Sequence, residues 1–475
     1  MMKRNKAGIG RLQAAWMRVW LSSVILLGCG VTFAAEGVVS IHKSNFFLFQ
    51  KGNDVLYPVG INSGGFLDPT YPEAGIEFHC KLWSESGANT LRINLDDFHA
   101  PTVLRDFENG DGTLKEAVLQ RLDRVLTIAQ AYKLDVILGF YDVETMVKHW
   151  DEHPYNRKNG GLCDSMGDFF TSPAVLGRAT KRVSQVVDYC KGRNIFAWEL
   201  ARGINIWELG MKLGIDDLPA KGEFWVFRMA DMLRRTDQEK RLLALSYAPN
   251  TLPLTLAGAP LIQINLLHIQ AKDPYKAAEF TPTLIHMARD YKKPVFVAET
   301  SWTGSDSRNP ELVRNIFWSS VASCSGTFLS ASRAYNENLL SDEELTLIKT
   351  LVPFVNYADL SGPPRPPSVV PILLEPPETF LLVEGMLGKD WIFWILRNQP
   401  GETAPRLTFR TVEGVYEYSW FPTDHVERAK SKPFSLKRKE IMLQCPSFGH
   451  DILGVLRLEH RAPQEKKDSA NPDQG

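Results

Sequence analysis

The chain has 475 residues, of which 44% are hydrophobic and 23% charged, so its composition is that of a folded protein and excludes disorder as the default. Because single cores stop growing near about 250–300 residues, this length predicts one large domain and a smaller one. The formal net charge of −1, with no long basic run, argues against a nucleic acid partner, whereas 12 Trp and 13 Tyr suit neutral ligands with apolar faces, such as sugars.

The N-terminus has the features of an export signal. A basic stretch precedes an apolar run from Trp20 to Phe33, and residues 32–34 resemble a signal peptidase site. We expect residues 1–34 to be cleaved, because the apolar run is shorter than the ~20 residues of a membrane span. The mature protein would then be periplasmic or extracellular, without a stable membrane span. The alternative is a lipoprotein anchored at Cys29, which follows Leu-Leu-Gly.

Five cysteines follow this segment, at Cys80, Cys163, Cys190, Cys324 and Cys445. None of them forms a CxxC pair or another metal-ligand spacing, so we expect neither a metal site nor a dense disulfide framework. An odd number leaves at least one free thiol. We expect Cys190 and Cys324, which lie in helical patterns, to be buried as small hydrophobic residues.

Residues 38–360 alternate between short β-rich runs and amphipathic helices, which predicts βα units around a parallel sheet. A hairpin comes first and is expected to cover the barrel floor. Thr113 and Glu116 match a capping box at the start of the clearest helix. A long loop is predicted at 143–172, and Pro173 opens the next helix. The first four strands are predicted at 57–61, 89–94, 134–142 and 195–200.

The second half of this region repeats the same alternation. Eight βα units over about 320 residues predict an α/β fold of the (β/α)₈ TIM barrel type. The remaining strands are predicted at 241–249, 261–270, 294–300 and 326–332, and the helices at 222–235, 275–290, 310–323 and 342–357.

The C-terminal part of the chain changes character. Residues 361–377 contain seven prolines and are predicted to form a stiff linker. Short strands separated by turn residues then predict a small antiparallel β-sandwich over 378–459. The polar tail, 460–475, is expected to be disordered.

Barrels of this type carry their chemistry at the C-terminal ends of the strands. Glu299 closes the predicted seventh strand, and Trp302 beside it offers a flat face to a sugar. Retaining hydrolysis of a glycosidic bond needs two carboxyl groups about 5 Å apart, one as nucleophile and one as proton donor. From its position alone, Glu299 is equally consistent with a structural salt bridge.

Several motifs resemble those of clan A glycoside hydrolases, most closely glycoside hydrolase family 5 with its cellulases and mannanases. The resemblance spans about residues 38–360, and the β-sandwich, with GVYEYSWFPT, is similar to the small domain often fused to such barrels. The motifs are GIN at 60–62, GANTLRIN at 87–94, HPYN and NGG within 153–161, AWEL at 197–200, LLHIQ at 266–270 and PVFVAETSW at 294–302.

The resemblance assigns roles to individual residues. It implies that Glu299 is the nucleophile, that Arg92 positions it, and that His268 lies at the floor of the sugar subsite. The residues that it places along the sugar groove are Asn62, Tyr141, Asp142 and Trp302.

The chain departs from the family pattern at the tip of strand four. Asn-Glu is expected after AWELA, with Glu as the acid/base, but Arg202 and Gly203 stand there, and Gln270 replaces a usual strand-six Tyr. Glycine has no proton to donate, and general acid assistance is typically worth ~10²–10⁴-fold in rate. The carboxyl groups that could substitute for it are Glu208, Glu199, Asp142 and Asp97.

Arg202 itself has two interpretations. A guanidinium beside the nucleophile could bind an anionic sugar such as a uronate. Alternatively, Arg202 pairs with Glu199 or Glu299 and closes the site.

Three functions remain open from the sequence. The first is an exported glycoside hydrolase with a displaced acid, acting on a β-linked polysaccharide or oligosaccharide. The second is a catalytically silent barrel that binds or guides a polysaccharide, and the third is a structural surface protein. The retained Glu299, Arg92 and His268 favour the first two. We expect a carbohydrate partner, neutral or uronate-containing, no cofactor, no metal and a monomeric protein.

Overall fold

The computed structural model describes residues 37–461, with gaps at 97–106, 303–308, 331–339, 359, 361–369, 376–379, 388–389, 398–403, 411–413, 425–433 and 437–439. The predicted export signal with Cys29, the candidate acid Asp97 and the tail from residue 462 onward therefore lie outside the described residues. From Val38 onward the described residues form one compact unit. None of the helices described is long and apolar enough to cross a membrane.

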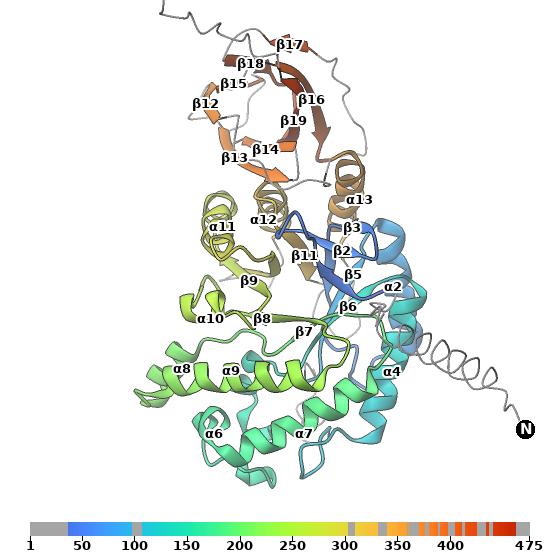
Figure 1. Ribbon diagram of the computed structural model, residues 1–475, viewed down its shortest axis with the longest axis vertical. Coiled ribbons are helices and arrows are strands. Elements are labelled where there is room, and N and C mark those ends of the chain that lie inside the picture. The colour runs from blue at the N-terminus through green and yellow to red at the C-terminus, as the bar shows by residue number, and fades with distance from the viewer. Residues whose placement is uncertain are drawn as a thin grey trace, which may run out of the picture. The chain divides into compact units, whose positions relative to one another are not determined.

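Eight parallel strands close into a barrel in the order β10-β11-β4-β5-β6-β7-β8-β9, which confirms the predicted (β/α)₈ fold (Figure 1). The strands are β4 (Val59–Asn62), β5 (Thr90–Asn94), β6 (Asp135–Gly139), β7 (Ile195–Glu199), β8 (Leu242–Ser246), β9 (Ile264–Ala271), β10 (Val295–Trp302) and β11 (Gly326–Ser330).

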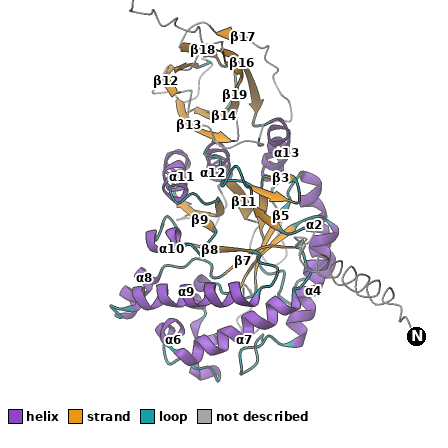
Figure 2. Cartoon of the chain, in the orientation of Figure 1, coloured by secondary structure: helices purple, strands orange, loops and turns teal. Residues whose placement is uncertain are grey.

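Helices surround the barrel strands (Figure 2). The long ones are α2 (Glu73–Ser86), α4 (Glu116–Ala131), α7 (Pro173–Tyr189), α9 (Leu218–Thr236), α11 (Pro274–Arg289), α12 (Pro310–Ala322) and α13 (Asp342–Tyr357). The shorter ones are α5 (Val143–Lys148), α6 (Met166–Thr171), α8 (Ile206–Leu213) and α10 (Leu254–Gly258), with 3₁₀ turns at Trp150–Glu152 and Arg157–Asn159. The predicted long loop at 143–172 thus contains two short helices, α5 and α6.

One local expectation, at the start of α4, differs from the structure. The capping box prediction is wrong: α4 begins at Glu116 after Lys115, and no side chain caps it. The Thr113 hydroxyl instead donates to Asp111 at 2.7 Å, because an Asp two residues earlier captures it in the turn.

A small antiparallel sheet covers one end of the barrel, as predicted for the floor. It comprises β1 (Val39–Ile41), β2 (Phe49–Lys51) and β3 (Asp54–Leu56). Phe49 enters an apolar core with Phe196 and Phe296, whose ring centroids lie 4.9 and 5.3 Å from its own. Apolar side chains therefore fill the lower part of the barrel, and polar ones are left for the opposite end.

Two antiparallel sheets follow the barrel. One has the order β13-β14-β19-β16-β17 and the other β12-β15-β18. Their strands are β12 (Val370–Glu375), β13 (Phe380–Leu387), β14 (Asp390–Arg397), β15 (Arg406–Arg410), β16 (Gly414–Pro422), β17 (Phe434–Leu436), β18 (Glu440–Gln444) and β19 (Asp451–Arg461).

Strand β12 lies inside the segment predicted as a linker. It occupies an edge of its sheet, and its register with β15 shifts between Pro371 and Leu373. Edge strands and irregular positions tolerate proline, since its missing N–H is not needed there. A proline-rich composition therefore did not exclude a strand.

Strand β14 is buried on both faces. Because side chains alternate along a strand, it contributes to two cores at once. Those facing the three-stranded sheet are Trp391, Phe393 and Ile395, and those joining the barrel core are Ile392, Trp394 and Leu396.

A buried polar cluster also joins β19 to α12 of the barrel. Arg314 donates to the Asp451 carboxylate at 2.5 Å, and the Trp394 ring nitrogen donates to the same group at 3.0 Å. The His450 ring lies 3.3 Å from Glu311 of α12. These contacts fix the sheets to the barrel wall.

Candidate active site

Five charged side chains meet at the C-terminal ends of strands β5, β6, β7 and β10, above the apolar core. Arg92 and Glu199 are 0% exposed, Arg202 and Asp142 1%, and Glu299 5%. Parallel strands end at the same rim of a barrel, so residues distant in sequence are neighbours there. The structure thus brings together five of the residues singled out from the sequence.

Arg92 binds Glu199 as a fork. Its Nε and Nη2 donate to the two carboxylate oxygens at 2.8 and 2.6 Å, and its Nη1 lies 3.5 Å from Oε2 of Glu299. Burial opposes the charge, but the Glu199 carboxylate raises the pKa of Arg92 above its ordinary value. Arg92 therefore connects the deeper carboxylate to the predicted nucleophile.

Arg202 binds Glu299 in the same way. Its Nη2 donates to Oε1 at 2.6 Å and its Nε to Oε2 at 2.9 Å, while its Nη1 donates to Asp142 at 2.9 Å. Of the two interpretations of Arg202, the pairing with Glu299 is the one seen. Both oxygens of the predicted nucleophile face guanidinium N–H groups.

The backbone holds Arg202 in this position. Its N–H donates to the Tyr141 carbonyl at 2.8 Å, and its own carbonyl accepts from Val143 at 3.1 Å. Asp142 caps helix α5 by accepting from the Thr145 N–H, and its N–H donates to Asp96 at 2.8 Å. Asp97 was a predicted candidate and Asp96 was not, although both follow the same strand.

Gly203 stands where the resemblance expects the acid/base. Its φ is +66°, a left-handed conformation that L side chains rarely adopt. A Cβ there would find only the Glu144 Cβ nearby, at 3.7 Å. The position therefore has room for a side chain but a backbone that favours glycine.

The polar side chains around this network are only partly satisfied. His268 lies opposite Glu299 in the β9–β10 register, and its Nε2 is 2.9 Å from the Ser301 hydroxyl. Asn62 and Asn94 end β4 and β5, and among the described residues the Asn62 carbonyl oxygen and both Asn94 amide atoms have no hydrogen-bond partner. Buried polar atoms normally have partners, so these amides are suited to a polar ligand or to water.

Asn94 and Ser301 are further site residues that the sequence analysis missed. Both stand within motifs that carried the resemblance, GANTLRIN and PVFVAETSW. Their position at strand ends was the available signal.

Two other predicted residues, Tyr141 and Glu208, lie elsewhere, and the side chain of a third is not described. Tyr141 is fully buried among Phe169 and Trp225 and does not line the mouth, because its side chain points away from the barrel axis toward the helices. Glu208 lies on the exposed side of α8, with the Lys212 ammonium 2.7 Å away. Trp302 ends β10, but its side chain lies outside the described residues.

The structure also offers no proton donor among the buried candidates. Glu199 accepts hydrogen bonds from Arg92 at both of its oxygens, and Asp142 accepts from Arg202. A guanidinium only donates, so an oxygen that accepts from it presents no proton to a ligand.

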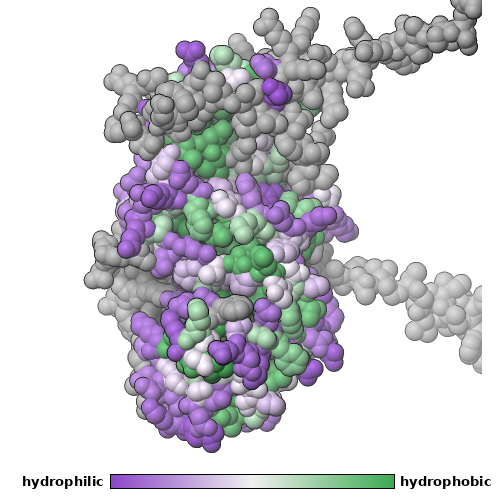
Figure 3. Space-filling model, turned by 90° about the vertical axis from the view of Figure 1, so that its left-hand side faces the viewer, coloured by the Kyte–Doolittle hydropathy of each residue, from purple (hydrophilic) through white to green (hydrophobic). Residues whose placement is uncertain are grey.

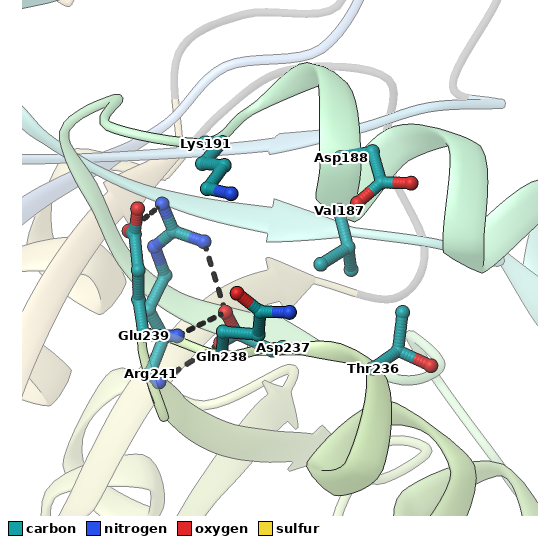
Figure 4. Close-up of a pocket in the computed structure, with 8 residues that line it drawn as sticks. All are labelled: Val187, Asp188, Lys191, Thr236, Asp237, Gln238, Glu239 and Arg241. Carbon is teal, nitrogen blue, oxygen red and sulfur yellow. Dashed lines mark hydrogen bonds and ion pairs between the residues drawn. The ribbon is translucent and has the colours of Figure 1, made fainter.

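A small pocket lies at the opposite end of the barrel, beside the start of β8 (Figure 4). Three of its charged groups already bind one another: Arg241 pairs with Asp237 at 3.2 Å and with Glu239. Its cavity of about 20 Å³ holds little more than a water molecule. Among the described side chains, no group of three or more His, Cys, Asp and Glu could hold a metal ion.

Neither protein-family models nor curated proteins match this sequence. Several solved structures share its fold. A protein described as a glycoside hydrolase superposes with a TM-score of 0.61 at 11% identity, over 90% of this chain and 98% of that chain.

Two structures from Bacteroides vulgatus are similarly close. A glycoside hydrolase family 5 protein gives a TM-score of 0.60 at 10% identity, over 89% of this chain and 94% of its own. A putative glycoside hydrolase gives 0.59 at 12% identity, over 90% and 84%. The chain therefore has the fold of glycoside hydrolases, a (β/α)₈ barrel followed by antiparallel β sheets.

Proposed function

We propose that this protein recognises a carbohydrate at the C-terminal mouth of its barrel without hydrolysing it. The observation that carries the proposal is the bidentate ion pair between Arg202 and Glu299, with Nη2–Oε1 and Nε–Oε2 at 2.6 and 2.9 Å. A retaining nucleophile needs an oxygen lone pair directed at the anomeric carbon. Here both oxygens are directed at a guanidinium that is itself buried.

The missing acid supports the same conclusion. Gly203 supplies no side chain, and the buried candidates for the acid, Glu199 and Asp142, are bound to arginines. Without proton donation, an ordinary glycosidic leaving group departs slowly. Two independent features therefore act against hydrolysis, one at the nucleophile and one at the acid.

The polar surroundings of the network support carbohydrate recognition over a purely structural role. His268, Asn62 and Asn94 place donors and acceptors at one rim of the barrel, and the two amides have atoms with no hydrogen-bond partner among the residues that the structure describes. A structural barrel gains nothing from such groups, since unpaired buried polar atoms cost free energy. A ligand rich in hydroxyl groups would satisfy them.

Hydrolysis with a displaced acid is the second candidate. Glu208 favours it, because this carboxyl group lies on the exposed helix after strand β7 and is not bound to a buried arginine. For that activity, Arg202 would have to release Glu299 when substrate binds. The basic and apolar N-terminal stretch supports export of either form of the protein.

A panel of β-linked polysaccharides, oligosaccharides and aryl glycosides tests the proposal, with wild type and Glu299→Gln compared side by side. Saturable binding by wild type without turnover supports it. Turnover that disappears in Glu299→Gln supports the hydrolase instead. If no carbohydrate binds to either protein, both candidates fail.

A further inference from the structure

A second cavity lies beside the site, between the end of β9 and the start of α11. Its volume is about 420 Å³. We call it the β9–α11 pocket; its lining residues are Asn250, Gln270, Ala271, Lys272, Asp273, Lys276, Ala277 and Phe280. The helices α10 and α11 lie on the side of the molecule shown in Figure 3, where hydrophobic and hydrophilic side chains alternate.

The pocket and the site share strand β9. Gln270 and Ala271 pair with Ser301 and Trp302 in the β9–β10 register, two and three residues beyond the pair of His268 and Glu299. At about 3.3 Å per residue, the pocket begins roughly 7 Å beyond His268. His268 and Gln270 also share one face of the strand, since side chains alternate.

The wall of the pocket is held rigidly. Asn250, in a left-handed conformation at φ 56°, accepts from the Gln270 N–H at 2.9 Å and donates to the Gln270 carbonyl at 2.6 Å. Its own N–H donates to the His268 carbonyl at 2.8 Å. Asn250, in the loop after β8, is thus fixed to strand β9, which carries both Gln270 and His268.

The charges of the pocket favour an anion. Lys272 and Lys276 are both exposed, and neither has an ion-pair partner in the described part of the chain. The carboxylate of Asp273, the acidic lining residue, caps α11 by accepting from the Lys276 N–H. Two exposed lysines of other helices, Lys212 and Lys221, do have carboxylate partners.

Phe280 adds an apolar surface next to these charges. It lies four residues after Lys276 on α11, so the two side chains share one face of the helix, and it is 38% exposed. An exposed ring beside cations and the Gln270 amide suits a ligand with an apolar face, hydroxyl groups and a negative charge.

We infer that the β9–α11 pocket binds a uronate residue of the glycan held at the barrel mouth. Lys272 and Lys276 would bind its carboxylate, and Phe280 would cover an apolar face of the sugar ring. Arg202, the other cation considered for this role, donates to Glu299 and Asp142 instead. The inference rests on the proposed carbohydrate recognition and adds the chemical class of the ligand.

Two oligosaccharides of equal length, a β-linked mannuronate and the corresponding neutral mannan, differ only in the carboxylate and provide the test. Calorimetric titration of the full-length protein should show tighter binding of the mannuronate. Lys272→Ala and Lys276→Ala should each weaken mannuronate binding by about two- to fivefold, with a greater effect at low salt. Neutral mannan binding should not change.

Lys349→Ala, which removes an exposed lysine from α13, is the matched control and should leave both affinities unchanged. The inference is overturned if the lysine variants bind the mannuronate as wild type does, or if wild type binds both oligosaccharides equally. Neutral binding in that case would leave the proposed function intact. If the protein binds neither oligosaccharide, both the inference and the proposed function are overturned. Cleavage of either oligosaccharide would contradict the proposed function alone.

Discussion

Replacing Arg202 by Gln should destabilise the protein far more than replacing Glu299 by Gln. The buried network contains three carboxylates, Glu199, Glu299 and Asp142, around the two guanidiniums of Arg92 and Arg202. Removing a guanidinium leaves three negative groups around one positive group. Removing the Glu299 charge leaves two of each.

The expected magnitudes follow from burial. Breaking a buried ion pair by deleting one partner costs about 3–5 kcal/mol, and Arg202→Gln leaves both Glu299 and Asp142 without their main donor. Glu299→Gln keeps one carbonyl acceptor for Arg202, so a loss of about 1–2 kcal/mol is expected. Buried pairs are poorly screened, so the difference should persist at high salt.

Urea unfolding followed by far-ultraviolet circular dichroism measures both values. Arg235→Gln is the matched control, because it removes an arginine from an exposed pair with Asp231 at 2.8 Å and should change stability by less than about 0.5 kcal/mol. Equal losses for Arg202→Gln and Glu299→Gln would refute the charge argument. A loss for Arg202→Gln no larger than that of the control would refute the buried network itself.

Three further outcomes are expected. Gly203→Ala should lower the stability of the protein by about 1 kcal/mol, because the φ of Gly203 is +66°. Gly177→Ala, in open space within helix α7, should be neutral or stabilising. Equal effects of the two variants in thermal unfolding would contradict the backbone argument. The double variant Arg202→Asn/Gly203→Glu frees the nucleophile and supplies an acid, so it should turn over an aryl glycoside that wild type does not cleave. If the triple variant that also carries Glu299→Gln retains this turnover, a group other than Glu299 is the nucleophile. Burial opposes ionisation of Asp451, but the His450 ring 3.9 Å away and the Arg314 guanidinium that donates to the carboxylate lower its pKa below the ordinary 3.8. Its contribution to stability is therefore fully present above the ordinary value and is lost as the pH falls through the lower pKa of the folded state, so melting temperatures compared between about pH 6 and pH 2 should fall less for Asp451→Asn than for wild type.

The order of elements in the barrel could be predicted because local pattern and packing agree there. Each strand that fills the barrel reads as a short β-rich run, and each outer helix has one apolar face. The β-sandwich was predictable for the same reason. Strand β12 was not, because its prolines conflict with strand propensity and only its edge position permits them.

The site was partly predictable. Strand ends and motifs located Glu299, Arg92, Arg202 and His268, since barrels place their polar residues at that rim. The sequence could not decide which carboxylate Arg202 binds, because that depends on side-chain directions at the ends of β6, β7 and β10. The same holds for Tyr141, whose outward direction follows from where strand β6 ends.

The most direct test of the account measures both binding and turnover of β-linked oligosaccharides and activated aryl glycosides by the wild-type protein. Carbohydrate recognition without hydrolysis predicts saturable oligosaccharide binding that weakens in His268→Ala, and no glycoside cleavage. Cleavage by wild type that is lost in Glu299→Gln would contradict it, because the nucleophile would then be working despite its fork with Arg202.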